Sequence, residues 1–124
     1  MERYNPESAP VAEEWLELDE GERIDLVQNY HRRKRIRLPQ ARLHATIHVV
    51  VENQLALGEQ VVIETLDRLQ AEGLTRHDAL HAIGLVVAEH LVDLMRSDPK
   101  DVSDPNAPYF ERLRRLSASS PDDT

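Results

Sequence analysis

The sequence contains no cysteine among its 124 residues. Disulfide bonds, thiolate nucleophiles and zinc sites built on cysteine are therefore excluded. Aromatic residues make up only 4% of the chain, whereas apolar residues as a whole make up 40%. The core of this single-domain-sized chain must therefore be built mainly from leucine, valine, isoleucine and alanine.

Long apolar runs are also missing. No run approaches the ~20 residues that a membrane-spanning helix needs. The N-terminal segment MERYNPESAP has no apolar stretch of the kind found in secretory signals. We therefore expect a cytoplasmic protein with no membrane association.

Basic residues are outnumbered by acidic ones, and the net charge of −8 argues against general nucleic-acid binding. One segment, HRRKRIR at 31–37, has the opposite character. It fits a solvated helix end, where cations interact favourably with the helix dipole, or a docking patch for an acidic partner. A homodimer or another protein partner is compatible with the sequence.

Capping and turn residues divide the chain into helices. Asp19 with Glu22 forms a capping-box pattern, Thr75 is a second N-cap, and Gly58 and Gly73 are typical helix stops. With the apolar periodicity, these signals predict helices over 11–18, 19–35, 40–57, 59–72, 75–96 and 109–116. No strand is predicted, so the expected fold class is all-α.

The predicted organisation is a compact bundle of about four main helices with short flanking helices. Residues 1–18 form an N-terminal arm with a short helix, and 19–97 form the bundle. Residues 98–124 contain a proline-rich linker, a short helix and a disordered acidic tail. Because short loops favour antiparallel neighbours, helices 40–57 and 75–96 are expected to run in the same direction.

The stretch HATIHVVVE places His44, His48 and Glu52 at successive fourth positions. Since a helix turns about 100° per residue, these three side chains form a stripe through the middle of the helix's apolar arc. Burying polar groups without partners costs a few kcal/mol each, so the stripe needs common partners.

The stretch RHDALHAIG supplies candidates. His77 and His81 are also four residues apart within an apolar face, and Gly84 and Ala88 would let another helix approach closely. We expect the two pairs to lie at the same level and to face each other. His31 and His90 are interpreted as lying on polar faces.

These groups suggest a metal site. Two imidazoles spaced i, i+4 can reach one ion, and zinc favours four ligands. His44, His48, His77 and His81 are the candidate ligands, with Glu52 as a fifth ligand, a replacement ligand or an acceptor that fixes an imidazole tautomer. Zinc is the first candidate, followed by iron, nickel and manganese. The alternative is a buried hydrogen-bond network in an interaction or adaptor module.

Whether the protein is an enzyme is not decided by these patterns. The stretch HDALH resembles the HExxH helix of zinc peptidases, with Asp78 at the position of the acid. However, Asp78 is one methylene shorter and fits the capping box of Thr75, and no strand is expected that would bind a peptide. Another metal-assisted hydrolysis or a redox reaction remains compatible with the site.

The motifs H-A-x-x-H-x-x-x-E-N-Q-L-A-L-G and R-H-D-A-x-H-A-I-G resemble those of a group of small bacterial proteins classed as a domain of unknown function. The resemblance covers 44–89. In a similar sister group, a glutamate takes the place of His81. That exchange replaces one type of metal ligand by another, so the resemblance implies a metal site more than a packing role.

Overall fold

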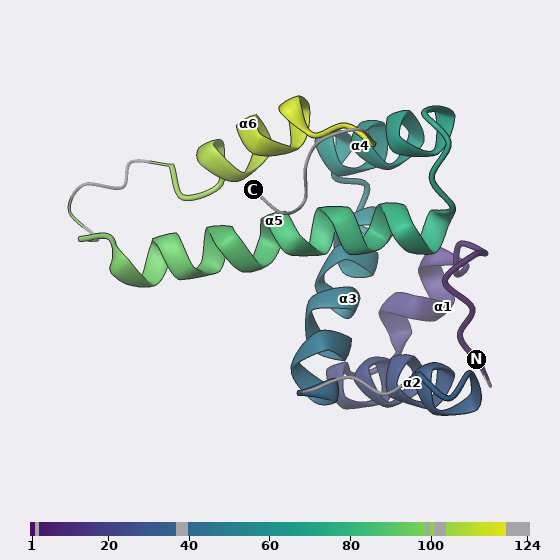
Figure 1. The fold of residues 1–124 in the computed structure, drawn as a ribbon. Helices are drawn as coiled ribbons and strands as arrows, with labels where there is room; N and C mark the ends of the chain where they lie inside the picture. Colours follow the sequence, from purple (N-terminus) through teal and green to yellow (C-terminus); the bar gives the residue numbers. More distant parts are fainter. Residues whose placement is uncertain (2, 37–39, 99, 101–103, 119–124) are drawn as a thin grey trace.

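The computed structural model describes residues 1, 3–36, 40–98, 100 and 104–118, and this part of the chain forms six helices and no strand (Figure 1). The predicted all-α class is confirmed. The helices are α1 (Ala12–Glu17), α2 (Glu20–Arg33), α3 (Ala41–Ala56), α4 (Gln60–Ala71), α5 (Arg76–Arg96) and α6 (Ala107–Arg115). The predicted acidic tail and part of the predicted linker lie outside the described residues.

Both predicted N-caps are confirmed. The Asp19 carboxylate accepts a hydrogen bond from the backbone N–H of Glu22 at 2.8 Å, and the Glu22 carboxylate accepts one from the backbone N–H of Asp19. The Thr75 hydroxyl accepts a hydrogen bond from the backbone N–H of Asp78 at 3.1 Å. These side chains satisfy N–H groups that the first turn of a helix leaves without partners.

The two predicted glycine stops are also confirmed. Gly58 and Gly73 have φ angles of +80° and +111°, in the left-handed region that favours glycine. After α4, the N–H of Gly73 bonds the carbonyl of Gln70 and that of Leu74 bonds the carbonyl of Leu69, which is a Schellman motif. The same pattern follows α3, so both turns are set by local sequence.

Helix α3 lies between two apolar clusters and packs against α1, α2, α4 and α5. The N-terminal core consists of Tyr4, Trp15, Ile24, Val27, Tyr30, Ala45 and Val49. The C-terminal core consists of Val51, Val62, Leu66, Leu69, Ala79, Leu80, Ile83, Val86, Val87, Tyr109 and Leu113. The polar stripe of α3 therefore runs between two apolar faces, as its helical spacing predicted.

The direction of α5 differs from the expectation. Figure 1 shows α5 running across α3 instead of alongside it, so the prediction of parallel neighbours was wrong. Short loops bring consecutive helices together, but they do not fix the angle between α3 and α5. The close approach predicted at Gly84 is confirmed, because a Cβ atom there would lie 3.2 Å from Cγ2 of Ile47.

The two flanking segments pack onto these helices. In the N-terminal arm, Tyr4 and Pro6 are buried. Helix α6 contacts α4 and α5 and buries Tyr109 and Leu113 between them, so its apolar face is covered from within the chain. Among the described residues, no helix combines the length and apolar composition needed to cross a bilayer.

Candidate metal centre

Four imidazoles converge where α2, α3 and α5 meet. One ring nitrogen from each of His31, His44, His48 and His81 lies within 4.8 Å of the other three. The structure thus brings together three of the histidines predicted from the sequence. It adds His31, which comes from a helix that the sequence analysis did not connect with the site.

The interpretation that His31 lies on a polar face was wrong, because its side chain is only 5% exposed. The spacing Ile24, Val27, His31 continues the apolar stripe of α2 by a step of three residues and a step of four. This periodicity could have revealed the burial of His31. The basic residues that follow it directly obscured the signal.

One nitrogen of His31 has no partner within the protein. Nε2 is buried without a hydrogen-bond partner. Because a neutral imidazole carries a lone pair on one of its two nitrogens, Nε2 can present that lone pair to an ion.

The spacing of His44 and His81 is close to that expected for a shared ion. Their Nε2 atoms are 3.2 Å apart and share a hydrogen bond. Two nitrogens bound to one tetrahedral zinc ion at about 2.0 Å would be separated by about 3.3 Å. The widest nitrogen pairs in the group would have to approach by roughly 1.5 Å for the same geometry.

His48 is the most deeply buried member of the group, with 3% of its side chain exposed. Its Nε2 lies 2.7 Å from the hydroxyl oxygen of Tyr4, and its Nδ1 is buried without a partner. His48 therefore has one anchored nitrogen and one unpaired nitrogen.

His77 lies beside this group and is not one of the four converging residues. Its ring centroid is 4.2 Å from that of His81 and 5.5 Å from that of His48, with the His48 ring stacked on it. Its Nε2 is buried without a partner. The structure therefore places this predicted ligand next to the four-histidine group.

Burial keeps these imidazoles neutral. Burial first, and then repulsion from neighbouring histidines, lowers the pKa of His48 to about 2 and the pKa values of His31 and His81 to about 4. The same causes lower the pKa of His44, and burial lowers that of His77. At neutral pH these rings carry lone pairs, which metal ligation requires.

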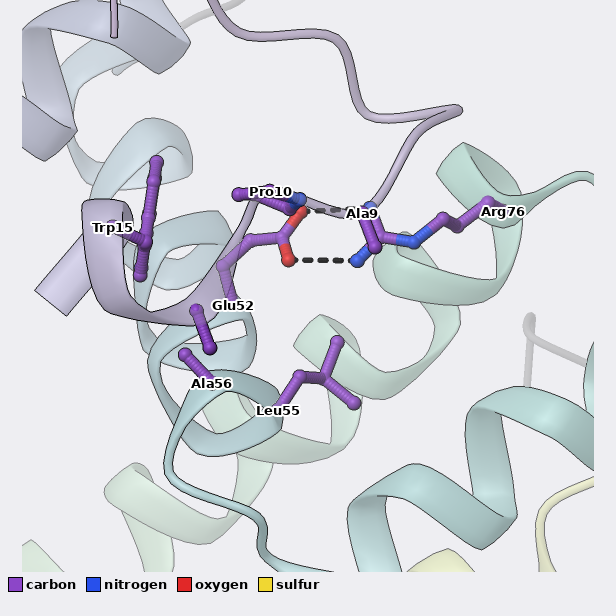
Figure 2. A pocket seen from close by; sticks show the side chains of 8 residues that line it. Ala9, Pro10, Trp15, Glu52, Leu55, Ala56 and Arg76 are labelled. Atoms are coloured by element: carbon purple, nitrogen blue, oxygen red, sulfur yellow. Dashed lines mark hydrogen bonds and ion pairs between the residues drawn. The ribbon is translucent and has the colours of Figure 1, made fainter.

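Glu52 has a different set of partners. Both of its oxygens accept hydrogen bonds from the Arg76 guanidinium, at 2.8 and 2.9 Å, and Oε2 also accepts one from the Tyr4 hydroxyl. Glu52 and Arg76 are 2% and 7% exposed. The pair lines a small pocket of about 100 Å³, together with apolar side chains that include those of Trp15 and Leu55 (Figure 2).

Arg76 was not among the predicted site residues, because an arginine in the first turn of a helix usually lies in solvent. The available signal was Glu52 itself. A carboxylate in the middle of an apolar arc needs a cationic or multiply hydrogen-bonding partner. Arg76 supplies both, and it directly precedes His77 on α5.

His90 is also buried, so the interpretation that it lies on a polar face was wrong as well. It continues the apolar spacing of Ile83 and Val87, and its ring stacks on that of Tyr109, with centroids 5.4 Å apart. Its Nε2 is buried without a partner, like that of His31. His90 contacts α6 instead of the other histidines, so it is a useful reference residue.

No family model, curated protein or solved structure matches the chain. The resemblance of its motifs to a group of small bacterial proteins therefore stays a prediction.

Proposed function

We propose that the protein binds one divalent transition-metal ion through His31, His44, His48 and His81. The observation that carries this proposal is the convergence of four imidazole nitrogens from three helices to within 4.8 Å of one another, with His31 and His48 buried and His44 and His81 partly buried. Tetrahedral coordination by four neutral nitrogens satisfies zinc, and the lowered pKa values keep the nitrogens unprotonated at neutral pH.

The unpaired nitrogens favour this proposal over a purely structural network. A hydrogen-bond network stabilises a core when its members are satisfied, and each buried polar atom left without a partner costs about 1–3 kcal/mol. In the described part of the chain, His31 Nε2, His48 Nδ1 and His77 Nε2 are all buried without partners. A metal ion provides a partner for the lone pairs that the protein leaves unpaired.

The donor set ranks the candidate metals. Imidazole suits zinc, nickel and iron, whereas manganese prefers carboxylate and water ligands. The four converging residues are all histidines, so we rank zinc first and manganese last. His77 would be an auxiliary fifth nitrogen beside His81. Glu52, held by Arg76, would act through its contact with Tyr4 instead of binding the ion directly.

Bound to such a site, a divalent ion would act as a Lewis acid on any group at an open coordination position. The protein's own contribution would be to hold neutral nitrogens in place on three packed helices and to exclude water from His48.

The test is elemental analysis of purified, untagged protein, with His31→Ala compared against His90→Ala. Both variants remove one buried histidine whose Nε2 is unpaired, but only His31 belongs to the converging group. We expect near-stoichiometric metal in the wild type and in His90→Ala, and a large loss in His31→Ala. Equal metal content in the two variants contradicts the ligand assignment.

The outcome for the wild type decides the proposal as a whole. If the wild-type protein contains no metal and is not stabilised by added zinc, nickel, iron or manganese, the histidines form a structural cluster. The search would then move to interaction partners.

A further inference from the structure

A chain of hydrogen bonds connects His48 to the N-terminal arm. The Tyr4 side chain is fully buried, and its hydroxyl oxygen lies 2.7 Å from Nε2 of His48. The same hydroxyl donates its proton to Oε2 of Glu52. Arg76 holds that carboxylate with two hydrogen bonds.

Counting protons along this chain fixes the tautomer of His48. A tyrosine hydroxyl has one proton, and a carboxylate paired with arginine only accepts hydrogen bonds. The Tyr4 proton therefore goes to Glu52, and the Tyr4 oxygen accepts a proton from His48. It follows that His48 carries its hydrogen on Nε2 and its lone pair on Nδ1, the atom that is buried without a partner.

We propose that Tyr4 is a positioning residue of the metal centre, which makes His48 bind the ion through Nδ1. This inference rests on the proposed metal-binding function. His31 differs from His48, because its unpaired nitrogen is Nε2. The site would therefore use Nδ1 of His48 and Nε2 of His31, and at His48 the bond at the opposite nitrogen makes the choice.

The arm that carries Tyr4 is fixed to the helices that carry the site. The Arg33 guanidinium of α2 donates to the Tyr4 carbonyl at 3.1 Å, and Arg76 of α5 donates to the Pro6 carbonyl at 2.9 Å. The backbone N–H of His77 donates to the Glu7 carboxylate at 3.2 Å. These bonds hold the phenol against His48, and Arg76 takes part in both the arm and the Glu52 pair.

The first test reads the tautomer directly in metal-free protein. Long-range proton–nitrogen correlation NMR on nitrogen-labelled protein distinguishes a protonated ring nitrogen from an unprotonated one. We expect His48 to show protonated Nε2 and unprotonated Nδ1 in the wild type. A wild-type spectrum with protonated Nδ1 overturns the proposal without the need for any variant.

The second test compares Tyr4→Phe with Tyr30→Phe in a chelator-competition titration with zinc. Both variants remove one hydroxyl from a buried tyrosine, but Tyr30 meets His31 and His77 only through ring contacts in the described structure. We expect Tyr4→Phe to bind zinc roughly 10- to 100-fold more weakly and its spectrum to show a mixture of His48 tautomers. We expect Tyr30→Phe to resemble the wild type in both measurements.

The outcomes separate this inference from the proposed function. Unchanged zinc affinity and an unchanged tautomer in a folded Tyr4→Phe variant overturn the role of Tyr4 and leave the metal site standing. A wild type that binds no zinc overturns the metal site. The tautomer of His48 is decided independently, because it is measured in metal-free protein. If Tyr4→Phe does not fold, the wild-type spectrum still decides the assignment of Nδ1.

Discussion

The polar stripe on α3 has a carboxylate end, Glu52, and a histidine end, His44 and His48, and these two ends differ in how their polar atoms are paired. At Glu52, both carboxylate oxygens are bonded to Arg76, and one of them also to Tyr4. One turn earlier, at His48, a ring nitrogen is buried without a partner. Both residues are buried to a similar extent, so burial does not distinguish a structural group from a ligand. Incomplete pairing together with membership of the converging group marks a candidate ligand, because Nε2 of His90 is also unpaired but lies outside that group.

The paired end can be broken by replacing Arg76 with alanine. This change leaves the Glu52 carboxylate buried without its cation, which typically lowers the free energy of unfolding by about 3–5 kcal/mol. The measurement is chemical denaturation at neutral pH. The matched control is Arg42→Ala, because the Arg42–Asp25 pair is largely exposed and should contribute no more than about 1 kcal/mol. Equal losses in the free energy of unfolding for Arg76→Ala and Arg42→Ala would show that the buried pair contributes no more than the exposed one.

The unpaired end can be tested by completing its pairing with metal. Free zinc at 100 times its dissociation constant should raise the free energy of unfolding by about 2.7 kcal/mol. This gain is the difference between the free energies of unfolding obtained from denaturation curves recorded with zinc and with chelator. In His48→Ala, we expect this difference to be small, whatever the stability of the variant itself. If zinc raised the free energy of unfolding of His48→Ala as much as that of the wild type, His48 would be excluded as a ligand.

Acid should affect the histidine cluster of the metal-free protein, in which His31 of α2 lies beside the unpaired end of the stripe. His31 has its pKa lowered from 6.5 to about 4, so between these values the unfolded chain binds a proton that the folded chain does not. Stability is therefore expected to fall as the pH drops from about 6.5 towards 4.

Removing His31 should reduce this dependence. In denaturation curves recorded across that range, the slope for His31→Ala should be shallower by on the order of 1 kcal/mol per pH unit. Above about pH 8 these histidines are neutral in both states, so the two proteins should then show the same small slope. Identical slopes at acid pH would show that His31 is not held neutral.

The smallest effect is expected at the boundary of the unpaired cluster. His77→Ala should retain near-stoichiometric metal and weaken zinc binding by less than tenfold, or about 1.4 kcal/mol, because His77 lies beside the four converging residues. Competition titration against a chromophoric chelator measures this change. Complete loss of metal would show that His77 is a required ligand and that the group of four is drawn too narrowly.

The helices could be predicted because their ends are set by local signals. Asp19 and Thr75 bond to N–H groups three residues later, and Gly58 and Gly73 take backbone angles that other residues avoid. The residues that contribute to these bonds lie within a few positions of one another, so the sequence alone is enough to predict where these helices begin and end.

The candidate site could be predicted only in part. The spacing of His44, His48 and His81 identified three of the four converging residues, because an i, i+4 pattern is visible within one helix. The contributions of His31, Arg76 and Tyr4 depend on how α2, α5 and the arm pack around α3. Loop lengths did not reveal the crossing of α5 over α3, and Tyr4 lies 44 residues before His48.

The position of α3 between the two cores has a consequence for hydrogen exchange. Amide protons exchange with solvent when a segment opens, and segments with fewer buried contacts open more readily. Helix α3 contributes side chains to both cores, whereas α6 contributes side chains only to the C-terminal core. Exposing the amides of α3 requires both cores to open, so they should exchange at rates close to that of global unfolding. The amides of α6 should exchange through smaller openings that leave the histidine cluster intact.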